Sequence, residues 1–213
     1  MKRNIPTLTI TLLLTLNVAV GQDQSFVKTH FDGDFVRYCI PYLKFPRQLA
    51  LQGVSGYAEV EFRINKQGKI DSIDVIRTPH MQFANDIVQI LLSTKDMWSA
   101  TKINEQPVDY KYTFVVEYRT TSNPDSPPVD KSEKIYKKAL KHQKKEKIDD
   151  ALLSINEAIG HNPYKKEYYQ LRSELLTSKG EQEKAKTDEL AVEKIQRQLI
   201  DDVIMIVAYG SGY

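Results

Sequence analysis

Apolar and polar residues alternate with a period of two in several stretches between residues 57 and 118. Successive side chains of a strand point to opposite faces of a sheet, so this alternation predicts half-buried strands. The clearest run covers residues 57–64, and its apolar positions are Ala58, Val60, Phe62 and Ile64. The turn formers at 65–68 then predict a hairpin into a second strand that contains Ile73 and Val75.

Apolar residues spaced by three and four predict an amphipathic helix over residues 81–94. A shorter helix is expected to begin at Pro46, which has no amide hydrogen to lose there, and to end at Gly53. A last alternating strand covers residues 110–118. The economical assembly of these elements is a small three-stranded antiparallel sheet with two helices.

The C-terminal part changes character, because glycine is scarce from Val129 onward and Lys, Glu, Ala, Leu and Ile dominate. The pattern predicts an all-α domain with helices over residues 131–145, 148–160, 165–178 and 181–198. The chain as a whole is therefore expected to be α+β, with a sheet domain followed by a helical repeat domain.

The N-terminus has the pattern of an exported protein. Lys2 and Arg3 precede an apolar run from Ile5 to Val20, so residues 1–21 are expected to be a secretory signal peptide cleaved near Gly21. The alternative is that this segment is retained as a membrane anchor, although it is shorter than the roughly 20 apolar residues of a spanning helix. After cleavage the chain is expected outside the cytoplasm.

Composition shifts divide the rest of the chain. Residues 22–37 are mixed and polar and are expected to form a loosely held arm before the sheet domain at 38–119. Turn formers and prolines at 120–130 predict a linker to the helical domain at 131–198. The tail at 199–213 is apolar enough to cap the helices, to extend the last helix, or to dock on a partner.

Composition and motifs do not indicate chemistry. Lys and Arg number 30 against 28 Asp and Glu, which does not suggest a nucleic-acid binder. The single cysteine, Cys39, is expected to be buried and inert or to be available for an intermolecular bridge. The four histidines are scattered without metal-ligand spacing, and no phosphate-binding loop is present. We therefore expect no enzyme, no catalytic residue, no cofactor and no metal.

Several motifs of the first domain occur in a recognisable order. They are Phe45-Pro46, Gly53 and Gly56, the alternating Val60 and Phe62, Gly68, Trp98, Asn104 and Pro107-Val108. In this order they resemble the C-terminal domain of the TonB family, with a departure at Ser99-Ala100. The resemblance implies a protein-binding domain of the Gram-negative cell envelope, linked to transmembrane transport, that catalyses nothing.

The helical domain has internal similarity. A period of roughly 34 residues maps Ile135, Ala139 and Ala151 onto Tyr169, Ser173 and Ala185, and this spacing resembles two tetratricopeptide repeats. Lys138, His142 and Arg172 depart from the family's pattern. Two repeats are fewer than the three usually needed for a continuous core, so a capping element is expected.

Both resemblances imply partner-binding residues. A partner peptide would add as a strand beside the last strand, assisted by residues before the first helix, at Tyr42, Lys44, Phe45, Pro46, Tyr110, Tyr112, Phe114, Val116 and Tyr118. The repeat family contacts its partners through the first helix of each pair, which implies Tyr136, Leu140, Gln143, Gln170 and Glu174.

The resulting hypothesis is a non-enzymatic periplasmic adaptor with two protein-binding modules, linked to an outer-membrane transporter. The alternative is a TonB-family energy transducer, which would need residues 1–21 retained as an inner-membrane anchor. Membrane association is expected only in that case, and no nucleic-acid partner is expected. A homodimer formed by strand exchange is left open, because exposed sheet edges would permit it.

Overall fold

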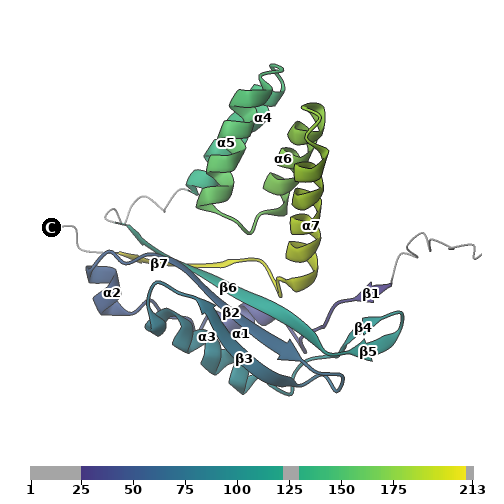
Figure 1. The fold of residues 1–213 in the computed structure, drawn as a ribbon. Helices are drawn as coiled ribbons and strands as arrows, with labels where there is room; N and C mark the ends of the chain where they lie inside the picture. Colours follow the sequence, from purple (N-terminus) through teal and green to yellow (C-terminus); the bar gives the residue numbers. More distant parts are fainter. Residues whose placement is uncertain (1–24, 122–129, 210–213) are drawn as a thin grey trace, which may run out of the picture.

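The computed structural model describes residues 25–121 and 130–209 of the chain. The fold is α+β, with the strands mainly in the N-terminal part and a run of four helices in the C-terminal part (Figure 1). In chain order the elements are β1 (Phe26–Val27), α1 (Phe35–Cys39), α2 (Arg47–Leu51), β2 (Gly56–Ile64), β3 (Ile70–Arg77), α3 (Met81–Ser93), β4 (Thr101–Ile103), β5 (Gln106–Val108), β6 (Tyr110–Thr121), α4 (Lys131–Gln143), α5 (Ile148–His161), α6 (Lys166–Ser178), α7 (Gln182–Gln198) and β7 (Ile204–Tyr209).

The main sheet has four strands in the order β3-β2-β6-β7. Strands β3, β2 and β6 pair antiparallel, which gives the three-stranded arrangement that the sequence predicts. The fourth strand, β7, pairs parallel to β6 and was not predicted. It comes from the apolar tail, for which capping, helix extension and partner docking were the three expectations. The tail forms a strand because its β-branched residues can pair with the outer edge of β6.

Helices α1, α2 and α3 cover one face of this sheet (Figure 1). The alternating apolar residues of β2 and β6 point to this face, and Val60, Phe62, Tyr112 and Phe114 are almost fully buried there. Farther along β6, Tyr118 stacks on Phe83 of α3 with the ring centroids 4.1 Å apart. The core of the sheet domain therefore lies between the sheet and these three helices.

The segment before residue 38 belongs to this core, so the expectation of a loosely held arm at 22–37 was wrong for the described residues. Phe31 and Phe35 are 5% and 4% exposed, and both rings contact Trp98. In addition, β1 pairs with β4 to form a small sheet with β5. The prediction rested on the polar composition of the segment and did not take its aromatic residues into account. Their burial in the core holds the segment in place.

The helical module, residues 131–198, consists of the two antiparallel helix pairs α4–α5 and α6–α7 (Figure 1). Its helices end within about two residues of the expected bounds. The small residues Ala139, Ala151 and Ala158 are fully buried, together with Ile155. Small side chains at these contacts let neighbouring helices approach closely.

Some expectations lie outside the described residues or at their border. The signal-peptide prediction for residues 1–21 falls outside them, as does most of the predicted linker at 120–130. At its two ends, Thr120 and Thr121 belong to β6, and Asp130 is the N-cap residue of α4. Within residues 25–121 and 130–209, no helix has the length and apolar character needed to cross a membrane.

Candidate functional site

Strand β6 is an internal strand of the sheet, because the chain's own C-terminal segment occupies the side away from β2. The parallel register pairs Val116 with Ile204 and continues to Thr121 with Tyr209. The contact begins earlier, where the amide of Ile200 donates to the carbonyl of Thr113 at 3.0 Å. This edge thus binds an extended segment along most of its length.

Two isoleucines fix the segment from the side of the core. Ile200 and Ile204 are 9% and 8% exposed, and Ile206 packs against the same cluster. Burying an aliphatic side chain of this size stabilises by roughly 1.5–3 kcal/mol. Met205 lies on the opposite face of β7 and is 38% exposed. Burial of aliphatic side chains and backbone pairing therefore hold β7 in place.

The residues predicted for the sheet edge divide into two groups. Tyr112, Phe114, Val116 and Tyr118 are buried in the core, so only their backbone atoms could take part in strand pairing. Tyr110 is half-buried at the start of β6, and its ring contacts Phe26. The structure thus assigns the side chains of β6 to packing and its backbone to β2 and β7.

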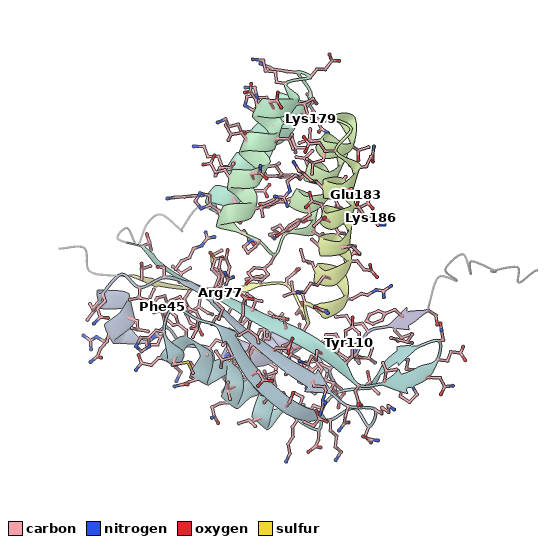
Figure 2. The ribbon with its side chains drawn as sticks, viewed as in Figure 1. Phe45, Arg77, Tyr110, Lys179, Glu183 and Lys186 are labelled. Atoms are coloured by element: carbon pink, nitrogen blue, oxygen red, sulfur yellow. The ribbon has the colours of Figure 1, made fainter. Side chains whose placement is uncertain are left out.

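The second group precedes α2 and lies toward the other end of the sheet from Tyr110 (Figure 2). Phe45 packs edge-on against Phe83 and Tyr118. Pro46 is the N-cap residue of α2, and the amide of Lys44 donates to Asp86 at 3.1 Å. The side chain of Tyr42 is 55% exposed. Of this group, Tyr42 and Lys44 are exposed to solvent, whereas Phe45 helps to build the core.

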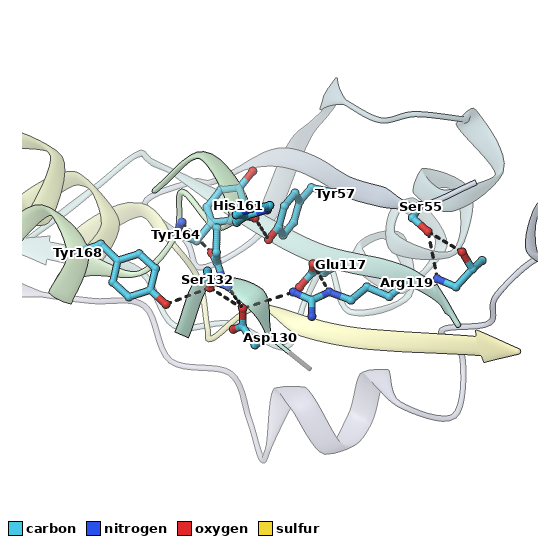
Figure 3. A network of polar contacts seen from close by, with 11 residues as sticks. Ser55, Tyr57, Glu117, Arg119, Asp130, Ser132, His161, Tyr164 and Tyr168 are labelled. Atoms are coloured by element: carbon cyan, nitrogen blue, oxygen red, sulfur yellow. Dashed lines mark hydrogen bonds and ion pairs between the residues drawn. The ribbon is translucent and has the colours of Figure 1, made fainter. Parts of the chain in front are cut away.

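The helical module packs with one end against part of the other face of the sheet (Figure 1). A polar network joins the two where β6 ends (Figure 3). Glu117 and Arg119 on β6 form an ion pair at 2.5 Å, and both are largely buried. Arg119 also lies 3.7 Å from Asp130, which caps α4 by accepting from the amide of Ser132 at 2.9 Å. The Ser132 hydroxyl lies 3.0 Å from that of Tyr168 on α6. The network thus runs from the sheet to the second helix pair.

Burial and hydrogen bonding set the protonation of this network. Burial acts to raise the pKa of Asp130, but hydrogen bonds from Ser132 and the positive charge of Arg119 outweigh it and hold this pKa below its usual value. Burial raises the pKa of Tyr168 to about 12, so this hydroxyl stays neutral. Asp130 is therefore the charged acceptor and Tyr168 a neutral member of the network.

A second contact between the sheet and the module centres on Tyr164, in the loop between α5 and α6. Its hydroxyl accepts from Arg77 of β3 at 2.7 Å, and Arg77 also pairs with Glu59. Its ring meets that of Tyr57 edge-on at 5.1 Å, and Tyr57 donates to the carbonyl of His161 at 3.0 Å. Burial, with the nearby Glu59 carboxylate, raises the pKa of Tyr164 above its usual range. This contact partly covers the Glu59 carboxylate, whose side chain is 16% exposed.

The residues predicted for the helical groove come from α4 and α6, which the structure brings together. The ring of Tyr136 lies 4.8 Å from that of Tyr168, and Leu140 packs against the core of the module. The amide of Gln143 donates to Glu174 at 3.3 Å across the two helices. Gln170 is exposed. Tyr136 and Leu140 thus stabilise the module, whereas Gln170 and Glu174 remain accessible to solvent.

Sequence reasoning did not find the polar network on β6. A signal was present, because Phe114, Val115 and Val116 are apolar in succession, which is typical of a strand covered on both faces. The structure confirms that Val115 is buried on the face opposite Phe114. The alternation at 110–118 was used to predict one buried face of the strand. The burial of Glu117 and Arg119 on its other face was therefore not predicted.

The described residues do not suggest a chemical centre. Among residues 25–121 and 130–209, no group of three or more His, Cys, Asp or Glu side chains could hold a metal ion. Cys39 is fully buried, and burial raises the pKa of its thiol to about 12, so the thiolate form is scarce at neutral pH. Of the two expectations for Cys39, the buried and inert one agrees with the structure.

Comparison with known proteins supports the resemblance of the first domain. Neither a curated protein nor a solved structure matches the chain. The tetratricopeptide interpretation of residues 131–198 stays a prediction. Residues 41–120 match the family model described as the Gram-negative bacterial TonB protein C-terminal domain, which agrees with the predicted domain at 38–119.

Proposed function

We propose that the chain is a non-enzymatic adaptor of the Gram-negative cell envelope, active in the periplasm after removal of residues 1–21. The TonB C-terminal family, whose model matches residues 41–120, is a protein-interaction domain without catalytic activity. The proposal assigns protein partners to both modules, with an outer-membrane transporter as the candidate partner of the sheet domain.

The pairing of β7 with β6 carries the proposal. A peptide that adds to a sheet gains main-chain hydrogen bonds along its length and side-chain specificity at alternate positions. The tail already makes these interactions, since Ile204 and Ile206 enter the core while the backbone pairs with residues 116–121. The outer side of β6 therefore has the shape and polarity of an acceptor for extended segments.

The helical module supplies the second proposed surface. Gln170 and Glu174 lie on α6, beside Gln143 of α4, and offer amide and carboxylate groups for hydrogen bonding. Because the aromatic and aliphatic neighbours of these groups belong to the module's own core, this surface favours a polar partner. Glu174 adds a negative charge to it.

Site-specific crosslinking in the full chain tests the assignment of the two surfaces. A photoreactive residue would replace Ser55, which is exposed near the end of β6, or Gln170 on α6, with exposed Lys186 of α7 as the matched control (Figure 2). We expect an outer-membrane transporter to be crosslinked from position 55 and not from 186. Crosslinks to envelope proteins only from position 170 would reduce the sheet domain to a scaffold, and equal crosslinking from all three positions would contradict both surfaces.

The alternative function is a TonB-like energy transducer. The match to the TonB family favours it equally, and it differs in requiring residues 1–21 as a retained anchor. Intact-mass measurement of the exported protein separates the two functions. Loss of residues 1–21 supports the free adaptor, whereas a retained N-terminus in the membrane fraction would overturn the adaptor and favour the transducer.

A further inference from the structure

The outer edge of β6 cannot be left bare without exposing buried backbone groups. Val115, Val116, Glu117 and Tyr118 are buried while β7 is in place, and β7 pairs with β6 along this stretch. Removal of β7 would break its backbone pairing with β6 and expose the apolar surface that Ile204 and Ile206 cover, at a cost of roughly 25 cal/mol per Å² of that surface. Any event that removes β7 is therefore unfavourable unless another extended segment takes its place.

Strand β7 is held as a peptide ligand would be. Residues 203–208 are all apolar, so their side chains make neither ion pairs nor hydrogen bonds. Ile204 is buried, whereas Met205 is exposed and Ile206, Val207 and Ala208 are partly exposed. The strand is thus bound through its backbone and a few aliphatic contacts, and another segment could supply the same interactions.

The opposite edge of the sheet is protected against strand addition. Strand β3 carries Asp71, Asp74 and Arg77, and its pairing with β2 contains two register shifts. Charged side chains and bulges are the devices by which proteins make edge strands unsuitable for further pairing. Residues 204–209 contain no charge and no proline. The two edges therefore differ, and the acceptor lies on the β6 side.

From these observations we infer that β7 is a resident strand, which a partner segment replaces at the outer edge of β6. This inference rests on the proposed function of the sheet domain. The register defines the partner, because directly paired residues share one face of the sheet and Ile204, Ile206 and Ala208 pair with Val116, Tyr118 and Thr120. The partner is an uncharged extended segment, parallel to β6, with aliphatic residues at two alternate positions and a small residue at the next.

The partner segment needs no charged residue on the face of the sheet that carries Glu117 and Arg119. Glu117 and Arg119 pair with each other at 2.5 Å, so neither needs a countercharge from an incoming segment. On β7 the positions beside them are Met205 and Val207. A charged residue placed there would gain little from a pair that is already neutralised. The inference therefore predicts discrimination by apolar pattern and not by charge.

A reversible covalent link between the two strands tests the inference in the full chain. Thr120 and Ala208 are directly paired and only partly buried, so the double variant Thr120→Cys/Ala208→Cys can form a disulfide when oxidised. Native Cys39 is fully buried and does not interfere. The probe is a fluorescent synthetic peptide with the sequence of residues 199–209, and binding is followed by anisotropy. The control peptide carries Asp at the positions of Ile204 and Ile206.

We expect the peptide to bind the reduced protein and to lose at least about tenfold in affinity, or about 1.4 kcal/mol, on oxidation. The control peptide should bind neither form, and equal circular dichroism of the two forms would show that the fold is intact. Equal binding to both forms would mean that the peptide binds at a site other than the one that β7 occupies. This result would overturn the inference, although the peptide could still add to the sheet as a strand. Absence of binding to the reduced form also overturns the inference, and the crosslinking from position 55 then decides separately whether the proposed function stands.

A second variant keeps the test decisive if the disulfide does not form. Ile206→Ala removes part of the aliphatic contact between β7 and the core without altering β6. We expect this variant to bind the native-sequence peptide about five- to tenfold more tightly than the unmodified chain, since the resident strand competes less well. The same change in the peptide should weaken its binding. An unchanged affinity in both experiments would show that β7 does not compete for the edge.

Discussion

Single residues decide whether the hairpin between β2 and β3 can close. Gly68 has a φ of +75°, and a Cβ at this position would collide with the carbonyl oxygen of Trp98. Both the backbone conformation and the close approach therefore require glycine. The side chain of Asn65 completes the turn by accepting from the amides of Gln67 and Lys69, each at 3.0 Å. The sequence predicted this turn, but not its contact with the segment of Trp98.

Alanine variants of Gly68 and Gly53 can separate the effect of backbone conformation from that of the close contact with Trp98. Gly53 has a similar φ of +69°, but no atom lies within 4 Å of the position of its Cβ. We expect Gly53→Ala to lower the free energy of unfolding by about 1–3 kcal/mol, the cost of a strained backbone. Gly68→Ala should lower it further because of the clash. Urea denaturation of both variants measures the difference, and equal losses would contradict a role for the Trp98 contact.

The departure of Arg172 from the repeat pattern has a structural explanation. Arg172 donates to both carboxylate oxygens of Asp188 on α7, at 2.8 and 2.6 Å, and to Asn156 on α5 at 2.8 Å. Asp188 is 2% exposed, so its charge depends on this partner. The arginine thus joins three helices through hydrogen bonds.

Removing one residue of this ion pair should lower the free energy of unfolding more than replacing both residues by apolar ones. We expect Asp188→Ala to lower the free energy of unfolding by about 3–5 kcal/mol, since it leaves a partly buried guanidinium without its partner. The double variant Arg172→Leu/Asp188→Leu should recover most of the loss, because apolar residues can substitute for a buried pair. Thermal denaturation of the single and double variants tests this, and additive losses would show that the two residues do not act as a pair.

At the scale of elements, the sequence pattern predicted the helices whose bounds depend on local interactions. The bounds of α4 to α7 follow from apolar periodicity, and α3 was expected at 81–94 and spans Met81–Ser93. By contrast, β7 pairs with a strand far away in the sequence, and six apolar residues alone do not say which edge they join. The same holds for β1 and α1, whose aromatic residues find their partner, Trp98, only in the folded chain. Long-range pairing therefore accounts for the parts that the sequence did not predict.

Acid should weaken the start of α4 through Asp130. Its pKa in the folded chain lies below the usual value of 3.8, so the unfolded chain takes up the proton first as the pH falls. The stabilisation by the charged form is complete above about pH 4 and is lost as the pH falls through the lowered pKa. Asp130→Asn keeps a capping side chain and should flatten this acid dependence, whereas Asp130→Ala should in addition cost about 1 kcal/mol at neutral pH. Urea titrations between about pH 2 and pH 7 compare the three proteins, and an unchanged acid slope in the Asn variant would contradict the assignment.

At the scale of the whole molecule, helices α1 to α3 cover one face of the sheet, and the helical module packs with one end against part of the other face (Figure 1). The helical module is connected to β6 at both of its ends, through Asp130 beside Arg119 and through Leu199 beside Thr113. Tyr164 adds a third contact between these ends. Because α7 leads directly into β7, displacement of β7 would also release the C-terminal end of the module. The two modules should therefore unfold as one cooperative unit when β7 is in place.

This cooperativity can be observed because the two modules have different spectroscopic reporters. Trp98 is the single tryptophan of the chain and lies in the aromatic core of the sheet domain, so its fluorescence reports that domain. Helices α4 to α7 contribute most of the helical circular dichroism. We expect the two signals to follow one urea transition in the unmodified chain, since coincident transitions are the mark of two-state unfolding.

Changes at Tyr164 test whether its contact holds the modules together. Tyr164→Phe keeps the ring against Tyr57 and removes the hydroxyl that accepts from Arg77, so we expect a loss of about 0.5–1.5 kcal/mol with the transitions still coincident. Tyr164→Ala also removes the ring contact and should separate the circular-dichroism transition from that of Trp98 fluorescence. If the transitions stay coincident in the alanine variant, the connections at Asp130 and Leu199 alone couple the modules. A partner that displaces β7 would then release the C-terminal connection and leave only the one at Asp130.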